Sequence, residues 1–161
     1  MNKLVKLGLA ALFALFAFSL AACNEKADPK ADYAKLVDWT QTNESTQAAF
    51  QAEYQQKLLS RDLVQVKEAM DSLVARNSKS IDSLKAIKIS DPEVKKLQEK
   101  TIEVLGISSD LTKSAVALMN NPNDQKIIEE VQAKTQQAQV QTAELQKMQA
   151  ELAAKYGADA K

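Results

Sequence analysis

The sequence predicts an all-α fold: an elongated antiparallel three-helix bundle with coiled-coil-like packing, either alone or with a short extra helix at its N-terminal end. Apolar residues recur at spacings of three and four over most of the chain after residue 30, which is the period of an amphipathic helix. Prolines and glycines number three each, and Pro92, Pro122 and Gly157 lie where helices would begin or end. Short connections near residues 90 and 121 make consecutive helices antiparallel neighbours.

Residues 1–22 have the organisation of an export signal peptide. Lys3 and Lys6 precede an apolar run over residues 7–20 that contains no charged residue. This run is shorter than the roughly 20 residues that a helix needs to cross the hydrocarbon core of a bilayer. We therefore expect the segment to be removed rather than retained as a membrane span.

The residues from Leu20 to Cys23, Leu-Ala-Ala-Cys, resemble the lipobox of bacterial lipoproteins. The resemblance implies cleavage after Ala22, a thioether-linked diacylglycerol on Cys23 and an acyl group on its amino nitrogen, so that a membrane is the first partner of the mature chain. The alternative is a structural thiol or an ordinary small-residue cleavage site. In enteric-type lipoproteins, which this segment resembles, an aspartate after the cysteine marks retention in the inner membrane. Because Asn24 stands at that position, the resemblance implies the outer membrane, with the protein facing the periplasm. Exposure at the cell surface is the alternative.

After cleavage the chain divides into a lipidated N-terminus and tether over residues 23–30, one helical domain over residues 31–157 and a frayed tail over residues 158–161. Its only cysteine is the lipidated one, so packing must stabilise the fold without a disulfide. Removing Lys3 and Lys6 from 21 basic and 21 acidic residues leaves a formal charge of −2. That charge suggests neither nucleic acid nor an anionic surface as a partner.

The chain has no histidine, which removes the commonest general acid or base near neutral pH and the commonest metal ligand. No spacing matches a nucleophile motif, a glycine-rich phosphate loop or a calcium loop. We therefore expect a protein that is not an enzyme and that has no catalytic residue, metal site or cofactor.

Residues 32–87 show helical periodicity in their apolar positions. The stretch from Thr40 to Thr46 is poor in helix formers and predicts a break between a short first helix and a long second one. Residues 77–80 give a weaker signal for a break, because the apolar period continues through them.

A helix that starts at Ser90-Asp91-Pro92-Glu93 and runs to about Met119 is predicted by the sharpest local signal in the chain. Ser90 and Glu93 have the spacing of a capping box, which places the start of the helix after Ser90. Gly106 lies inside this helix, where glycine costs about 1 kcal/mol relative to alanine. We interpret it as a close helix–helix contact or a mild bend rather than a functional hinge.

The last predicted helix, over residues 124–156, is the most regular and would be about 50 Å long. One of its stripes is apolar and consists of Val131, Ala138, Leu145 and Leu152. The neighbouring stripe is partly polar and consists of Ile128, Thr135, Thr142, Gln149 and Tyr156. Because of those polar members, the helix fits better as one wall of an intramolecular bundle than as a free coiled coil.

Most aromatic residues of the mature chain gather near its N-terminal end, at Tyr33, Trp39, Phe50 and Tyr54. One interpretation is an interaction cluster that lines a small apolar groove or touches the bilayer interface. The other is that these side chains fill the end of the bundle, since helical spacing alone produces core positions.

Lys161 gives the chain a resemblance to the major murein lipoprotein of enteric bacteria, which combines a lipobox, a helix and a C-terminal lysine joined to peptidoglycan. The resemblance implies Lys161 as a peptidoglycan attachment residue. The chain departs from that protein in being longer and in having its helices divided at Pro92 and Pro122. A solvated tail is the alternative.

The leading hypothesis is a lipid-anchored, non-enzymatic helical lipoprotein of the bacterial cell envelope, acting as a structural or protein-interaction module with an envelope protein as its partner. The second is a chaperone-like accessory that holds a client segment or a lipid chain in a groove beside the aromatic residues. The third is a peptidoglycan tether through Lys161. An apolar groove of several hundred Å² would favour the second, and an unbroken polar surface would favour the first.

Overall fold

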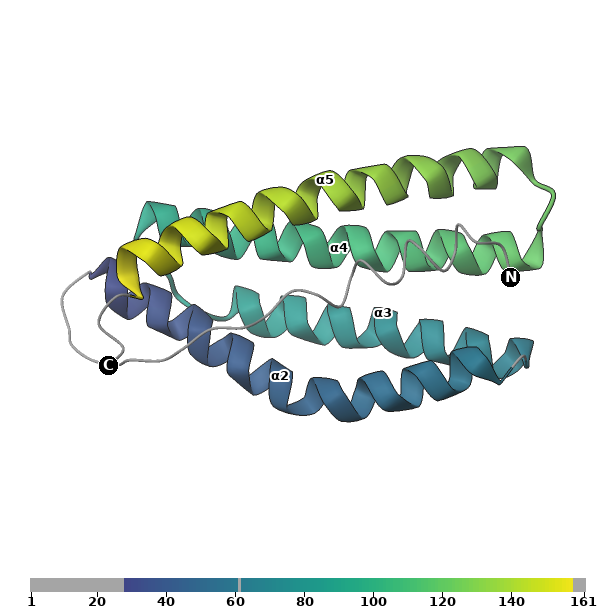
Figure 1. The fold of residues 1–161 in the computed structure, drawn as a ribbon, viewed down its shortest axis with the longest axis horizontal. Coiled ribbons are helices and arrows are strands. Elements are labelled where there is room, and N and C mark those ends of the chain that lie inside the picture. The colour runs from purple at the N-terminus through teal and green to yellow at the C-terminus, as the bar shows by residue number, and fades with distance from the viewer. Residues whose placement is uncertain (1–27, 61, 158–161) are drawn as a thin grey trace.

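The computed structural model describes residues 28–60 and 62–157. Its helices are α2 (Pro29–Leu59), α3 (Leu63–Lys85), α4 (Pro92–Asn120) and α5 (Gln125–Tyr156), and the described residues contain no strand (Figure 1). The predicted all-α class is confirmed. The sequence pattern predicts three long helices, whereas the described part of the chain contains four. The difference arises because the segment over residues 32–87 divides after Leu59 rather than between Thr40 and Thr46.

The predicted break between Thr40 and Thr46 is wrong, because α2 continues through this stretch. Its polar side chains hydrogen-bond to carbonyl groups one turn earlier: Thr40 Oγ1 donates to Leu36 O and Thr42 Oγ1 donates to Asp38 O, each at 2.9 Å. Such bonds satisfy the hydroxyl groups inside a helix and tend to bend it. In agreement, α2 is bent near the middle of its length in Figure 1.

The chain instead leaves the first helix at Ser60. The Ser60 hydroxyl donates to Lys57 O at 2.7 Å and accepts from Asp62 N at 3.1 Å, so one side chain closes α2 and positions the start of the next helix. Asp62 then caps α3 by accepting from Val64 N at 2.9 Å. The apolar period runs through this corner, so periodicity alone does not reveal it.

Helix α4 begins close to the predicted position, but its cap is Asp91 rather than Ser90. Asp91 Oδ1 accepts from Glu93 N and Val94 N, both at 2.9 Å. Ser90 donates its backbone N–H to Asp32, and the Glu93 side chain turns toward α5, so neither forms the predicted capping box. Aspartate is an equally good cap, and its charge is favourable at a helix N-terminus.

The predicted start, end and buried stripe of α5 are confirmed. Asp124 caps the helix by accepting from Lys126 N at 2.9 Å, and Gly157 is its C-cap. The whole apolar stripe is buried: Val131, Ala138, Leu145 and Leu152. In the partly polar stripe, Thr142 and Gln149 are buried, whereas Ile128, Thr135 and Tyr156 are half-buried.

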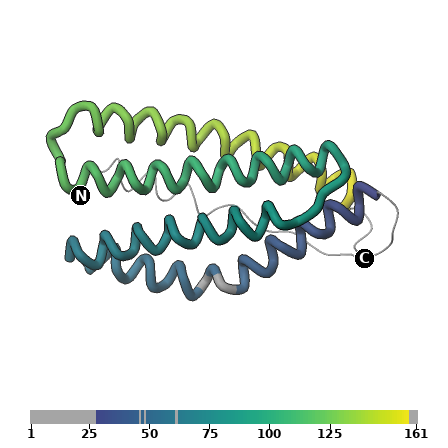
Figure 2. Tube along the Cα trace, turned by 180° about the vertical axis from the view of Figure 1, so that it is seen from behind, coloured from purple at the N-terminus to yellow at the C-terminus, as the bar shows by residue number. Residues whose placement is uncertain are grey.

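Consecutive helices lie side by side and antiparallel, and α2 also contacts α4 and α5. At one end of the molecule the start of α2, the loop between α3 and α4, and the end of α5 lie together (Figures 1 and 2). Tyr33 and Tyr156 pack there, with ring centroids 6.1 Å apart. We call residues 28–40, 84–98 and 149–157 the four-helix end.

The largest hydrophobic cluster extends from the four-helix end and draws on every described helix. Its buried members are Tyr33, Leu36, Val37, Leu84, Val94, Leu97, Val104, Leu145 and Leu152. Clusters elsewhere join two or three helices, such as Met70 and Ala115 between α3 and α4, or Leu111 and Val131 between α4 and α5. The four-helix end is therefore where the helices are held together as one unit.

Gly106 lies inside α4, and the predicted close helix–helix contact at this residue is wrong. A Cβ atom added to it would meet no atom within 4 Å. Because glycine costs about 1 kcal/mol relative to alanine inside a helix, we expect Gly106→Ala to raise the free energy of unfolding by about that amount. Urea denaturation followed by circular dichroism measures the change. A loss of stability would contradict the open space described around this residue.

Candidate functional site

At the four-helix end, the Asp32 carboxylate joins α2 to the loop that precedes α4. Asp32 is 4% exposed and accepts from Ser90 N at 2.6 Å, from Asp91 N at 2.8 Å and from Lys35 Nζ at 2.7 Å. Burial alone would raise the pKa of Asp32, but the hydrogen bonds from Lys35, Asp91 and Ser90 together outweigh it and hold that pKa below its ordinary value. The side chain is thus an ionised structural clamp.

A side chain from α4 closes the end of α3. Gln98 is buried, and its Nε2 donates to Leu84 O at 2.7 Å and to Ile87 O at 2.9 Å. The last carbonyl groups of a helix have no partner within that helix. The buried amide of Gln98 supplies one, which fixes the loop between α3 and α4 against the bundle.

The end of α5 is attached to the start of α4 by Glu93. Its carboxylate accepts from Lys155 Nζ and, at 3.2 Å, from the Tyr156 hydroxyl. The hydrogen bond between Lys155 and Glu93 lowers the pKa of the glutamate and raises that of the lysine. Both charged side chains are about half exposed, so the pair by itself contributes little to stability.

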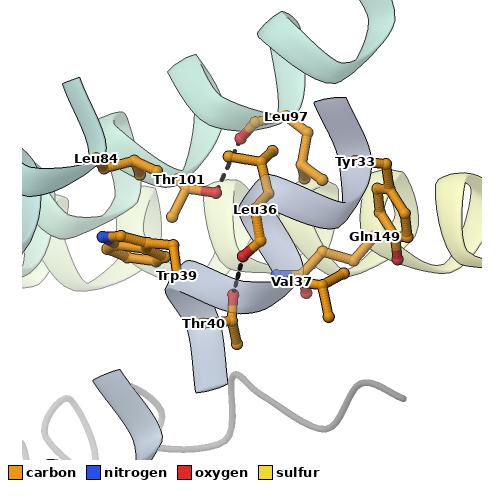
Figure 3. Close-up of a pocket in the computed structure, with 9 residues that line it drawn as sticks. All are labelled: Tyr33, Leu36, Val37, Trp39, Thr40, Leu84, Leu97, Thr101 and Gln149. Carbon is orange, nitrogen blue, oxygen red and sulfur yellow. Dashed lines mark hydrogen bonds between the residues drawn. The ribbon is translucent and has the colours of Figure 1, made fainter. Parts of the chain in front are cut away.

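Two of the aromatic residues singled out in the sequence, Tyr33 and Trp39, line a small pocket at the four-helix end (Figure 3). The other lining residues are Leu36, Val37, Thr40, Leu84, Leu97, Thr101 and Gln149. The cavity measures about 20 Å³, which accommodates one water molecule and is far too small for an acyl chain or a peptide segment. Trp39 Nε1 donates to Ser83 Oγ at 2.9 Å, which holds the indole against α3.

Phe50 and Tyr54 lie farther along α2, in a separate cluster with Ala69 and Leu73 of α3. Their rings stack with centroids 5.8 Å apart, and the guanidinium carbon of Arg76 lies 5.0 Å from the centroid of the Phe50 ring. Burial raises the pKa of Tyr54, so its phenol stays protonated. The aromatic residues therefore form two packed sites, one at each half of α2, rather than one cluster.

The corner between α2 and α3 is an exposed apolar surface that the periodicity of the sequence did not reveal. Leu59, Leu63 and Val64 are 75%, 67% and 66% exposed, and Leu58 packs partly buried beside them. We call Leu59, Leu63 and Val64 the apolar corner. It lies at the opposite end of α2 from the four-helix end (Figure 1). Adjacent apolar pairs are its sequence signal, because a helix face rarely buries two successive residues.

A family model described as uncharacterised lipoprotein PM1805 matches residues 30–157. The chain belongs to this lipoprotein family. The matched region begins after the lipobox, so it supports the resemblance drawn from residues 20–23 independently of those residues. No curated protein and no solved structure matches the chain.

Membership of the family makes this lipoprotein a membrane-anchored protein of the cell envelope. The predicted signal peptide, Cys23 and the terminal tail with Lys161 lie outside the residues that the structure describes. Within residues 28–60 and 62–157, no helix combines the length and the apolar character of a membrane span. The same residues contain no group of three or more histidine, cysteine, aspartate or glutamate side chains placed to hold a metal ion.

Proposed function

We propose that this lipoprotein is a non-enzymatic interaction module, held at the periplasmic face of the outer membrane by lipid on Cys23 and presenting the apolar corner to another envelope protein. Residues 20–23 and the family match support the anchor, and Asn24 supports the outer membrane. Cys23 would carry a diacylglycerol and an N-acyl group. Acyl chains contribute about 0.8 kcal/mol per buried methylene, so two or three of them hold a soluble domain stably.

The length of the tether determines which end of the bundle stays near the membrane. At about 3.5 Å per residue, the segment from Cys23 to Pro29 reaches about 20 Å. The four-helix end, where α2 begins, is therefore kept close to the bilayer. Since α2 has 31 residues and a helix rises about 1.5 Å per residue, its far end can stand about 45 Å farther away.

The observation that carries the proposal is the exposure of Leu59, Leu63 and Val64 at one corner. Single exposed apolar residues are ordinary, whereas a group of them at one place is typical of a contact surface. Lys57, two residues before Leu59, pairs with Glu68 of α3 at 3.7 Å, so the same corner also joins α2 to α3 through charged side chains. The surface is a corner rather than a groove, which favours contact with a folded partner.

Photo-crosslinking in living cells tests this proposal. A benzophenone amino acid in place of Leu63 should give an adduct of one defined mass, and Leu59→Asp in the same chain should reduce its yield severalfold, because the charge disrupts an apolar contact. The matched control carries the benzophenone in place of Val140, which is 51% exposed on α5. Equal adducts at both positions, or none at Leu63, would contradict a partner at the apolar corner.

A further inference from the structure

Four lysines surround the loop between α3 and α4 at the four-helix end. Lys85 ends α3, Lys88 lies in the loop, and Lys95 and Lys96 lie in the first turns of α4; all are exposed. None of them forms an ion pair within 4 Å with another residue of the described segments. We call these four side chains the lysine set.

Three carboxylates at this end, those of Asp32, Asp91 and Glu93, have hydrogen-bond partners outside the lysine set. Asp32 binds Lys35 and two backbone N–H groups, Asp91 caps α4, and Glu93 binds Lys155. Residues 79–96 contain five lysines and three acidic residues. The small negative charge of the mature chain therefore conceals a local positive excess in this segment, which the formal charge alone did not show.

The lysine set also lies beside the start of α2. The bonds from Ser90 N and Asp91 N to Asp32 tie the loop to the first turn of that helix, and Lys35 Nζ donates to Lys88 O at 3.1 Å. The tether from Cys23 brings the same turn to within about 20 Å of the bilayer surface at full extension. Attraction between exposed charges acts within a Debye length, which is about 10 Å at 0.1 M salt. The lysines are therefore out of range of the headgroups when the tether is fully extended, and come within range when it is less extended.

We propose that the lysine set lies against the phosphate headgroups of anionic phospholipids in the bilayer that holds the acyl chains of Cys23. This inference rests on the proposed lipid anchor and adds an orientation to it. Lipid on one residue leaves the bundle free to turn about its tether, whereas charge contacts around the loop between α3 and α4 restrict that motion. The apolar corner then points away from the membrane.

The test uses the full lipidated protein in phosphatidylethanolamine vesicles with or without phosphatidylglycerol. A bimane fluorophore is attached at Ala86→Cys in the loop or at Asn121→Cys in the turn before α5, both exposed positions. The lipids carry a nitroxide quencher on the headgroup. The tether alone gives position 86 some excess of quenching over position 121. With phosphatidylglycerol, we expect that excess to increase at least about twofold, and raised salt to remove the increase.

A quadruple variant isolates the contribution of the lysines. Neutralising the lysine set should abolish the increase in quenching that phosphatidylglycerol causes at position 86; the substitutions are Lys85→Gln, Lys88→Gln, Lys95→Gln and Lys96→Gln. A matched control neutralises four exposed lysines elsewhere and should leave that increase intact; its substitutions are Lys67→Gln, Lys113→Gln, Lys126→Gln and Lys147→Gln. The comparison of lipids and salt needs no variant, so it holds even where a variant folds poorly.

The outcomes separate this inference from the lipid anchor. Protein that floats with the vesicles but shows equal quenching at positions 86 and 121, or quenching that is indifferent to phosphatidylglycerol, would overturn the orientation and leave the anchor standing. Protein that fails to float with any vesicles would overturn the anchor and the orientation together.

Discussion

Asp32→Ala is expected to lower the free energy of unfolding by about 3 kcal/mol. The change removes a buried carboxylate and leaves two backbone N–H groups, those of Ser90 and Asp91, without their acceptor. Urea unfolding at neutral pH measures the loss. Asp38→Ala, at an exposed position of the same helix, is the matched control and should change stability by less than about 0.5 kcal/mol. Similar values for both variants would show that Asp32 does not hold the loop to α2.

The lowered pKa of Asp32 gives this clamp a defined pH dependence. A group whose pKa is lower in the folded state contributes stability above its unfolded value, about 4 for aspartate, and the contribution is lost as the pH falls through the folded value. We expect the difference in stability between the natural protein and Asp32→Asn to be largest near neutral pH and to shrink below about pH 4. A difference that does not change with pH would contradict an ionised clamp.

Leu145→Ala is expected to cost about 3 to 4 kcal/mol of stability. Leu145 is 0% exposed in the cluster that joins all four described helices, so truncation leaves a cavity where the surrounding side chains cannot easily collapse. Val140→Ala, on the same helix and 51% exposed, should cost less than about 1 kcal/mol. Thermal and urea unfolding of both variants test this. A larger loss at Val140 than at Leu145 would mean that α5 packs through a different face.

The last helix could be predicted from the sequence almost in full, because its signals are local. The apolar stripe through Val131 and Leu145 has helical spacing, and Asp124 and Gly157 lie where a cap and a stop are expected. The first helix could not be predicted in this way, because helix propensity does not show which carbonyl group a side-chain hydroxyl will donate its hydrogen bond to. Thr40 is a poor helix former in isolation, yet in α2 it is buried and bonded to Leu36 O.

The continuity of α2 also explains why the aromatic residues separate. Tyr33 and Tyr54 lie on one unbroken helix, and at about 1.5 Å per residue they are about 30 Å apart. A break between Thr40 and Thr46 would have allowed the chain to fold back and bring them together. The two sites therefore follow from the same hydrogen bonds that carry the helix through its polar stretch.

The polar clamps at the four-helix end depend on tertiary contacts that no local pattern encodes. Asp32 accepts from Ser90 N, 58 residues farther along the chain, and Gln98 reaches the carbonyl groups of Leu84 and Ile87 only because α3 and α4 pack side by side. Both residues are polar, and polar residues of these types usually lie at the surface. The apolar corner was also missed, although its adjacent apolar pairs, Leu58-Leu59 and Leu63-Val64, do not fit a single helix face.

The lipid anchor is tested most directly by measuring the intact mass of the natural protein after extraction from membranes and comparing it with the mass of the Cys23→Ala variant. We expect the natural chain to have the mass of residues 23–161 plus a diacylglycerol and an N-acyl chain, and the variant to lack the lipid and leave the membrane fraction. An unacylated mass for the natural chain would contradict the lipid anchor at Cys23, and with it the orientation of the bundle on the bilayer.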